Sequence, residues 1–386
     1  MPDVHAKLSA SGAHRWLACP GSILLEEDLP DQSSEYAKEG TLAHAVAELK
    51  LRKYFGKGIG SKTFQKRMEA LRTSEYWQAE MDRYTEDYFD EVRRRALSYP
   101  TVPYVNIEER VDFSDWVPEG FGTCDCVMIH GDEMQVIDLK YGKGVAVNPE
   151  NNPQLMLYGL GAYAAYSSIY EIKTVRLVIM QPRLDSTLEW VIRTEDLLTW
   201  GDGIKATAKE AYEGSERLAP GDHCRFCRAK ARCPERGERM FQVVETIKPE
   251  MAKEIVLLSN EEIATFLTAS KGIIDWIKDL EDEALRSILA GEDVPGYKAV
   301  EGRSNRAFKD QDRALEILKG IGFDEAVLYE RKPLSLSKLE KIVGKKTFGE
   351  VLGDEIIKPQ GKPTLVEESD KRPPFVKDYG FTNLEK

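Results

Sequence analysis

Long apolar runs are missing from this sequence of 386 residues. A transmembrane helix needs about 20 consecutive apolar residues, so we do not expect a membrane-spanning protein or a membrane partner. The N-terminal segment MPDVHAKLSASGAHRWLACP also lacks the apolar centre of a secretory signal peptide. These absences predict a cytoplasmic protein.

An excess of positive charge is missing as well. The chain has 54 Lys and Arg against 66 Asp and Glu, which gives a net charge of −12. A protein that coats nucleic acid non-specifically needs the opposite balance. An enzyme with a local basic groove stays compatible with this composition, because Lys and Arg cluster within residues 62–67 and 225–232.

Cysteine is scarce, with six residues, and a reducing cytoplasm disfavours disulfides. Three of the cysteines, Cys224, Cys227 and Cys233, follow a spacing typical of metal ligands. A fourth ligand is needed, and Cys19 is the remote candidate, with His223 as an alternative. Zinc and an iron–sulfur cluster would both accept these residues.

Apolar periodicity predicts an α/β fold with a mostly helical C-terminal region. The expected elements are helices at 34–54 and 62–97, strands at 104–113, 121–129 and 134–141, a helix at 153–167, strands at 174–180 and 187–193, and a helix at 195–212. The step from the helix at 153–167 to the next strand is a crossover. That strand should therefore lie parallel to a neighbour in a mixed sheet.

The composition predicts three parts. Residues 1–240 should form the α/β domain with the cysteines, and residues 241–357 an α-rich domain. Residues 358–386, rich in Pro, Gly, Lys and Asp, should be extended or disordered. In the second part Ser259 and Glu262 predict the start of a long helix, and Gly291 its end. Residues 296–308 are expected to form a short strand or one arm of a hairpin.

The segment FGTCDCVMIHGDEMQVIDLKYG carries the most informative pattern. A hairpin turn at Gly131-Asp132 would place Asp125 opposite Asp138, with Cβ atoms about 4.5–5.5 Å apart, and Lys140 on the same face. Opposed like charges destabilise a sheet unless a divalent cation compensates them. Two solvated surface aspartates are the alternative. Apolar residues expected on the other face disfavour it: Cys124, Cys126, Met128, Ile137 and Leu139.

Several motifs together resemble a known superfamily. Asp125 followed by Asp138-Leu139-Lys140 resembles the PD-(D/E)XK nuclease signature. The segment Glu39-Gly40-Thr41-Leu42-Ala43-His44 resembles the helical motif of RecB-like nucleases, and Gln154 with Tyr158 resembles their Gln-x-x-x-Tyr motif. The order helix, three strands, helix, strand also matches the restriction-endonuclease-like core of that superfamily.

The cysteine arrangement, one before this core and three after it, resembles that of the iron–sulfur nucleases, including AddB-type and CRISPR-adaptation enzymes. The similarity covers about residues 8–238. The whole chain looks like a phage- and prophage-associated family of RecB-like proteins, which would place it in the cytoplasm of a bacterial host.

The resemblance implies roles for particular residues. His44, Asp125 and Asp138, with the Leu139 carbonyl, would bind Mg²⁺ or Mn²⁺. Lys140 would orient or activate the attacking water, and Gln154 and Tyr158 would position the phosphate backbone and the lysine. Cys19, Cys224, Cys227 and Cys233 would hold a [4Fe–4S] cluster, with zinc as the alternative. Glu109 is expected as a further acidic neighbour.

The expected function is that of a metal-dependent DNA nuclease. An exonuclease hydrolysing phosphodiester bonds in phage recombination, replication or repair fits best. DNA would be the partner, together with a single-strand annealing protein or a helicase. The alternative is a DNA-binding or adaptor protein, stapled by iron–sulfur or zinc, with little nuclease activity. The C-terminal part would guide DNA, recruit a partner or stabilise the fold.

Overall fold

The computed structural model describes residues 6–30, 35–56, 58–144, 146–247, 260–300, 311–320, 328 and 345–352. The chain forms two compact units, Met1–Val300 and Glu301–Lys386. In the second unit the described helices are α10 (Gln311–Gly320) and α13 (Lys345–Leu352). The expected tail at 358–386 and the capping residue Ser259 lie outside the described residues. The boundaries at 240 and 357 stay predictions, and the first unit extends beyond residue 240.

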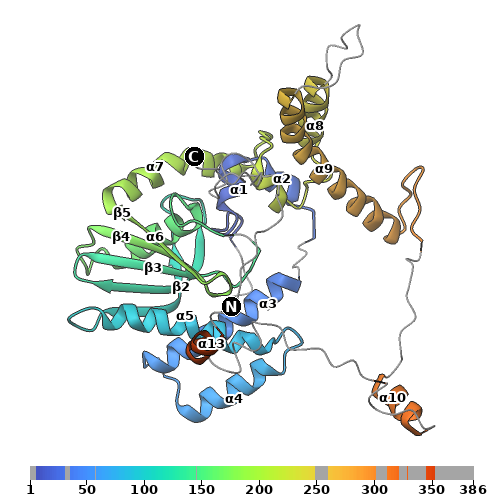
Figure 1. Cartoon of the computed structure of the whole chain (residues 1–386). Coiled ribbons are helices and arrows are strands. Elements are labelled where there is room, and N and C mark those ends of the chain that lie inside the picture. Colours follow the sequence, from blue (N-terminus) through green and yellow to red (C-terminus); the bar gives the residue numbers. More distant parts are fainter. Residues whose placement is uncertain are drawn as a thin grey trace, which may run out of the picture. The chain divides into compact units, whose positions relative to one another are not determined.

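A five-stranded mixed sheet forms the centre of the first unit (Figure 1). Its strands are β1 (Tyr104–Asp112), β2 (Phe121–His130), β3 (Glu133–Leu139), β4 (Thr174–Gln181) and β5 (Ser186–Arg193), which lie in that order. β3 and β4 are parallel, and the other neighbours are antiparallel. The predicted α/β class and the parallel crossover, made through α6 (Pro153–Tyr166), are therefore confirmed.

The β2–β3 hairpin has the predicted register. Val127 pairs with Val136, and Ile129 pairs with Met134. The turn residue Gly131 has a φ of +61°, which glycine adopts without a steric cost. This register places residues 125 and 138 at the end of the hairpin that lies away from the turn.

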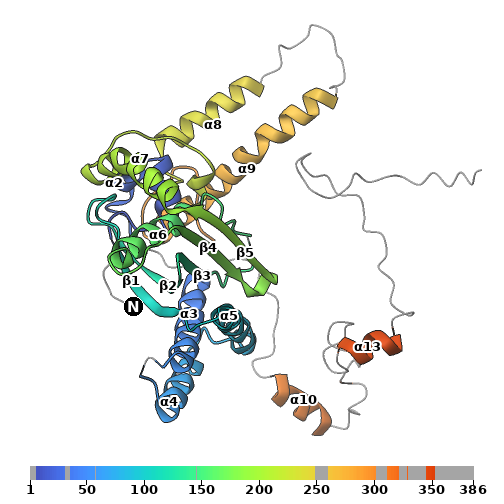
Figure 2. The same cartoon turned by 90° about the vertical axis from the view of Figure 1, so that its left-hand side faces the viewer.

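Helices cover both faces of the sheet (Figures 1 and 2). On one face, α1 (Ala13–Ala18), α6 and α7 (Thr194–Glu213) contribute Trp16, Leu160 and Leu197 to a core cluster. On the other, α3 (Glu35–Tyr54) and α5 (Ala79–Leu97) contribute Leu51, Tyr88 and Val92. The short elements are α2 (Ser22–Glu26), η1 (Pro182–Leu184) and η2 (Asp222–Phe226).

The expected single helix at 62–97 is wrong, because two helices, α4 (Ser61–Arg72) and α5, occupy that stretch. Between them the Thr73 hydroxyl donates to the carbonyl of Ala70 at 2.7 Å. The backbone N–H of Tyr76 donates to the Ser74 hydroxyl at 3.3 Å. Such local bonds from side chains compete with helical hydrogen bonds and end the first helix.

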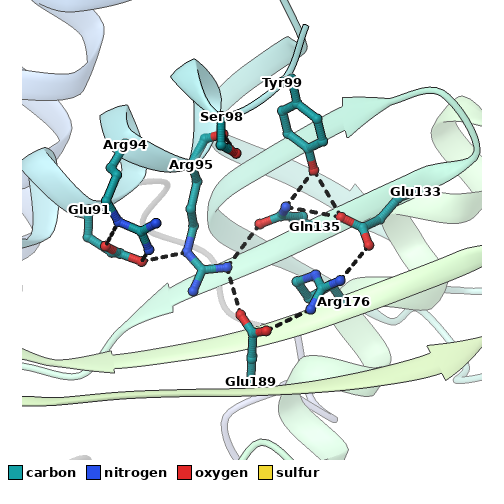
Figure 3. Close-up of polar contacts among 9 residues, drawn as sticks. All are labelled: Glu91, Arg94, Arg95, Ser98, Tyr99, Glu133, Gln135, Arg176 and Glu189. Atoms are coloured by element: carbon teal, nitrogen blue, oxygen red, sulfur yellow. Dashed lines mark hydrogen bonds and ion pairs between the residues drawn. The ribbon is translucent and has the colours of Figure 1, made fainter.

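A polar network fastens α5 to the sheet (Figure 3). Arg95, only 9% exposed, bonds Glu91 on its own helix at 2.9 Å. It also reaches Gln135 of β3 at 3.3 Å and Glu189 of β5 at 2.9 Å. Arg176 of β4 bonds the same Glu189 at 2.7 Å. The network therefore sets the position of α5 against three strands.

Two helices follow the α/β core, α8 (Pro234–Ile247) and α9 (Asn260–Leu289). They pack side by side, with the rings of Phe241 and Trp276 5.9 Å apart. The start of α9 at Asn260 and a φ of +91° at Gly291 agree with the predicted helix. Residues 296–300 form no strand, and 301–308 lie outside the described residues. None of the described helices has the length and apolar character needed to cross a membrane.

Candidate functional site

In β1, the alternation of side chains between the two faces of the sheet is inverted halfway along the strand. Val105 and Ile107 pack on the α3–α5 side of the sheet, whereas Val111 packs on the α1–α6–α7 side. Strict alternation would keep all three on one face. The inversion follows Glu108, whose φ of 51° is rare for a residue with a side chain. Such conformations cost about 1–3 kcal/mol and cluster at functional sites.

β2 inverts at the same level. Cys126 and Met128 pack on the α3–α5 side, but Cys124 packs on the opposite side. The prediction that Cys124 shares a face with Cys126 is therefore wrong, although both are fully buried. Asp125 lies between the two cysteines. The inversion therefore affects the direction of its side chain, which contacts His44 of α3.

His44 of α3, Glu108 of β1 and Asp125 of β2 form a group of possible metal ligands. One ligand atom from each lies within 4.8 Å of the others, and His44 Nδ1 is 3.0 Å from Asp125 Oδ1. They line a small pocket together with Tyr88 and Leu139. Within the described parts of the chain, no other three histidine, cysteine or acidic residues gather so closely.

Sequence reasoning selected the wrong one of two adjacent glutamates. Glu109, the expected acidic neighbour, contacts Asn106 and the Tyr166 hydroxyl instead. Glu108 takes its place because the strand inverts there. Two consecutive glutamates in an alternating strand were the available signal, and alternation alone assigned them to the wrong faces.

Asp125 also joins the two strands of the hairpin. Its Oδ2 accepts a hydrogen bond of 2.6 Å from the backbone N–H of Leu139. The β2–β3 ladder ends with the pair Cys126 and Ile137, so this carboxylate continues the pairing beyond the ladder. Leu139 thus contacts Asp125 through its N–H, and metal binding by its carbonyl stays a prediction.

A second polar group contains the other four residues predicted for the site. Lys140 Nζ lies 3.0 Å from Asp138 Oδ2 and 2.9 Å from Gln154 Oε1. Gln154 Nε2 in turn donates to the Tyr158 hydroxyl at 3.2 Å. The Asn152 side chain caps α6 by accepting the N–H of Gln154 at 3.1 Å, which fixes Gln154 at the start of the helix.

The charges of the two groups act on each other. Burial alone would lower the pKa of His44, but Asp125 and Asp138 outweigh it and raise that pKa to about 9. Burial, with Asp125, raises the pKa of Glu108 to about 7. Burial also raises the pKa of Asp138 against the effect of Lys140. His44 and Lys140 overcome burial at Asp125 and lower its pKa. The site thus concentrates acidic groups that a divalent cation would stabilise.

The four cysteines predicted as ligands line one pocket: Cys19, Cys224, Cys227 and Cys233. Cys19 follows α1, and its Sγ accepts a hydrogen bond of 3.4 Å from the N–H of Ala219. Cys224 Sγ accepts one of 3.3 Å from Gly221. The fold therefore brings Cys19 to the distant cysteines.

Contacts between protein groups also join the segment around Cys19 to the segment that contains the other three cysteines. Glu26, 3% exposed, pairs with Arg15 and accepts the backbone N–H of Arg228 at 2.7 Å. The N–H of Gly21 donates to the carbonyl of Arg217 at 2.9 Å. A Cβ at Gly21 would lie 2.8 Å from that carbonyl oxygen, so the close approach requires glycine.

Two buried polar atoms in the cysteine pocket have no hydrogen-bond partner, Ser22 Oγ and His223 Nε2. Buried polar atoms are nearly always bonded. Burial, and next the Glu26 carboxylate, raise the pKa of the Cys227 thiol to about 12. The sulfur donors and the two unbonded atoms fit a metal group bound in this pocket.

The fold and these sites define a mixed α/β protein with a histidine–carboxylate group and a separate cysteine pocket. The chain belongs to the family described as Protein of unknown function (DUF2800), whose model matches residues 5–373. Among solved structures it is similar to one described as the crystal structure of SSO0001. The identity is 15%, the match covers 57% of this chain and 96% of that chain, and the TM-score is 0.24. A similarity this low carries no argument.

Proposed function

We propose that this chain is a metal-dependent DNA nuclease of the PD-(D/E)XK, RecB-like kind, with exonuclease action as the leading form. The observation that carries the proposal lies where the β2–β3 ladder ends. Beyond the last residue pair of that ladder, Asp125 of β2 contacts His44 of α3, and Asp138 of β3 contacts Lys140. Phage recombination, replication or repair, alongside a single-strand annealing protein or a helicase, is the proposed setting.

The ligand set that we propose for Mg²⁺ or Mn²⁺ is His44, Asp125, Asp138 and the Leu139 carbonyl, with Glu108 added from the structure. Carboxylate and carbonyl oxygens suit both ions. Such an ion, when bound, activates water and offsets negative charge on phosphate. His44 has to lose its proton to become a ligand, so binding should release a proton.

Lys140 would supply positive charge beside the metal ligands. Its contacts with Asp138 and Gln154 hold the ammonium group in place before substrate binds. A preoriented cation stabilises the charge that develops on a phosphate in the transition state. Tyr158, bonded to Gln154, would keep this arrangement in place and help to position the phosphate backbone.

We further propose that the cysteine pocket holds a [4Fe–4S] cluster. A zinc ion would need every sulfur ligand about 2.3 Å from one atom. Among the described residues, the cysteines surround a pocket, but no three of them gather within 4.8 Å of one another. This wider spacing supports a cluster, in which each iron takes its own ligand. The cluster would clamp the two ends of the α/β core.

End-labelled single- and double-stranded DNA, incubated with Mg²⁺ or Mn²⁺, tests the nuclease proposal. Progressive loss of label from an end that stops on addition of EDTA is the expected result. Asp132→Ala is a matched control, because this aspartate sits in the same hairpin with its side chain 62% exposed. Stable DNA under all metal conditions would leave the alternative of a metal-stapled DNA-binding or adaptor protein.

A further inference from the structure

The cysteine pocket contains more possible ligands than a cluster with one ligand per iron requires. Four thiols line it, and His223 lines it as well. His223 is 7% exposed, and its Nε2 is buried without a hydrogen-bond partner. A nitrogen in this state loses the hydrogen bond that water would give it, unless a bound group replaces water.

The surroundings of His223 fix its ring. Burial lowers the pKa of the His223 imidazole, and a contact with the Ala219 backbone partly offsets this effect. A Cβ at Gly221 would lie 3.1 Å from the ring, so the glycine lets the backbone pass close to it. A histidine that binds a metal usually has a partner on one side of its ring and leaves the other ring nitrogen for the metal. The buried Nε2 of His223 is the nitrogen left without a partner.

We infer that His223 binds the metal group of the cysteine pocket through Nε2. The ligand set then combines this imidazole with cysteine thiolates, and one of the four cysteines is not needed to hold the metal. Ser22, whose buried Oγ also lacks a partner, would donate a hydrogen bond to a sulfur of the same group. The inference rests on the metal-holding role proposed for the pocket, and not on DNA cleavage.

X-ray absorption at the metal edge, on the full chain purified without oxygen, tests the inference for iron and zinc alike. The expected spectrum shows sulfur scatterers and one nitrogen at about 2.0–2.1 Å for zinc, or the corresponding short distance for iron. His223→Ala should lose the nitrogen signal, and its metal affinity should fall by at least the about 10–100-fold seen when outer-shell partners are removed.

Two further variants keep the test sharp. His223→Cys should retain the metal with a spectrum of sulfur alone, because a thiolate can replace the imidazole. His14→Ala removes a ring that lies 6.3 Å from that of His223 and should leave the spectrum unchanged. Among single Cys→Ser variants, one should keep a full metal complement.

A sulfur-only spectrum for the unaltered protein would overturn the inference. The same holds for an unchanged spectrum in His223→Ala, or for a protein that binds no metal in this pocket. Metal content in Cys227→Ser reports on the pocket separately, and DNA cleavage by Asp138 variants reports on the nuclease. Failure at His223 can therefore be told apart from failure of either proposed role.

Discussion

The imidazole of His44 and the carboxylate of Asp125 lie 3.0 Å apart, although 81 residues separate them in the chain. Two features make this contact. Helix α3 packs on the sheet through Ala47 and Leu51, and β2 inverts its alternation around Asp125. The contact therefore depends both on the packing of α3 against the sheet and on the arrangement of the candidate metal centre.

Substitutions of Asp138 and Lys140 should affect metal binding and the rate of DNA cleavage differently. Asp138→Ala should abolish metal-dependent DNA cleavage with the fold intact. Lys140→Ala should lower the rate by about 10²–10³-fold, the usual loss when a preoriented charge is removed, with little change in metal affinity. Rates on labelled DNA and calorimetric metal titrations measure the two effects. Wild-type cleavage by Asp138→Ala would remove the active-site assignment.

The His44–Asp125 pair should make the stability of the metal-free protein depend on pH. The pKa of His44 rises from 6.5 to about 9 on folding. The pair's contribution is therefore fully present below pH 6.5 and is lost as the pH rises through about 9. Thermal melts in EDTA should show this loss, and His44→Asn should flatten that part of the curve. Added Mg²⁺ should stabilise most at high pH, where protons compete least. An equal pH dependence in His44→Asn would contradict the assignment.

The cysteines should divide into two classes. Anaerobically purified protein should be brown with about four irons per chain. Cys227→Ser should lose the colour and aggregate more readily, because closing a loop of some two hundred residues contributes about 4–5 kcal/mol in loop-entropy arguments. Cys124→Ser, in the sheet core, is the matched control and should stay brown. If metal analysis finds zinc and no iron, the proposed cluster is wrong, but a metal site that joins the two ends of the core remains. A full cluster in Cys19→Ser would show that the fourth ligand is another residue, with His223 as the first candidate.

The network around Arg95 should stabilise the fold without affecting the chemistry. Arg95→Met removes bonds to Gln135 and Glu189, of which Gln135 is only 5% exposed. A buried group left unbonded costs about 1–3 kcal/mol, so the free energy of unfolding should fall by that amount. Arg193→Met, on an arginine whose side chain is 65% exposed, is the control and should change little. A loss of metal affinity equal to that of His44→Asn would show that the network belongs to the site.

Two truncations should separate the roles of the C-terminal part. A chain ending after Val300 should keep the cluster and cleave DNA, but with lower affinity or processivity if the second unit guides DNA. A chain ending near residue 245 lacks Asp279, which bonds Lys230 at 2.6 Å and the buried Arg236 at 2.7 Å. An unpaired buried charge costs about 3–5 kcal/mol, so this shorter chain should lose the cluster on mild heating. Unchanged DNA binding and digestion after truncation at Val300 would rule out guidance.

The sequence by itself determined the features that depend on local patterns. The Gly131-Asp132 turn and the alternation of its strands set the hairpin register, which the pairing of Val127 with Val136 confirms. The crossover through α6 placed β4 parallel to β3. The spacing of Cys224, Cys227 and Cys233 marked them as one group, because short spacings bring ligands together whatever the rest of the fold does.

Only the tertiary structure decided which glutamate reaches His44 and which side of the sheet Cys124 takes. One positive φ at Glu108 inverts the alternation of β1, and no periodic pattern contains that conformation. The neighbouring β2 inverts at the same level, which places Cys124 on the opposite side from Cys126. The contact of Cys19 with Ala219, and the buried nitrogen of His223 beside it, also needed the fold. Side chains some two hundred residues apart meet only after helices and strands have packed around a common core, and this packing is a property of the whole chain.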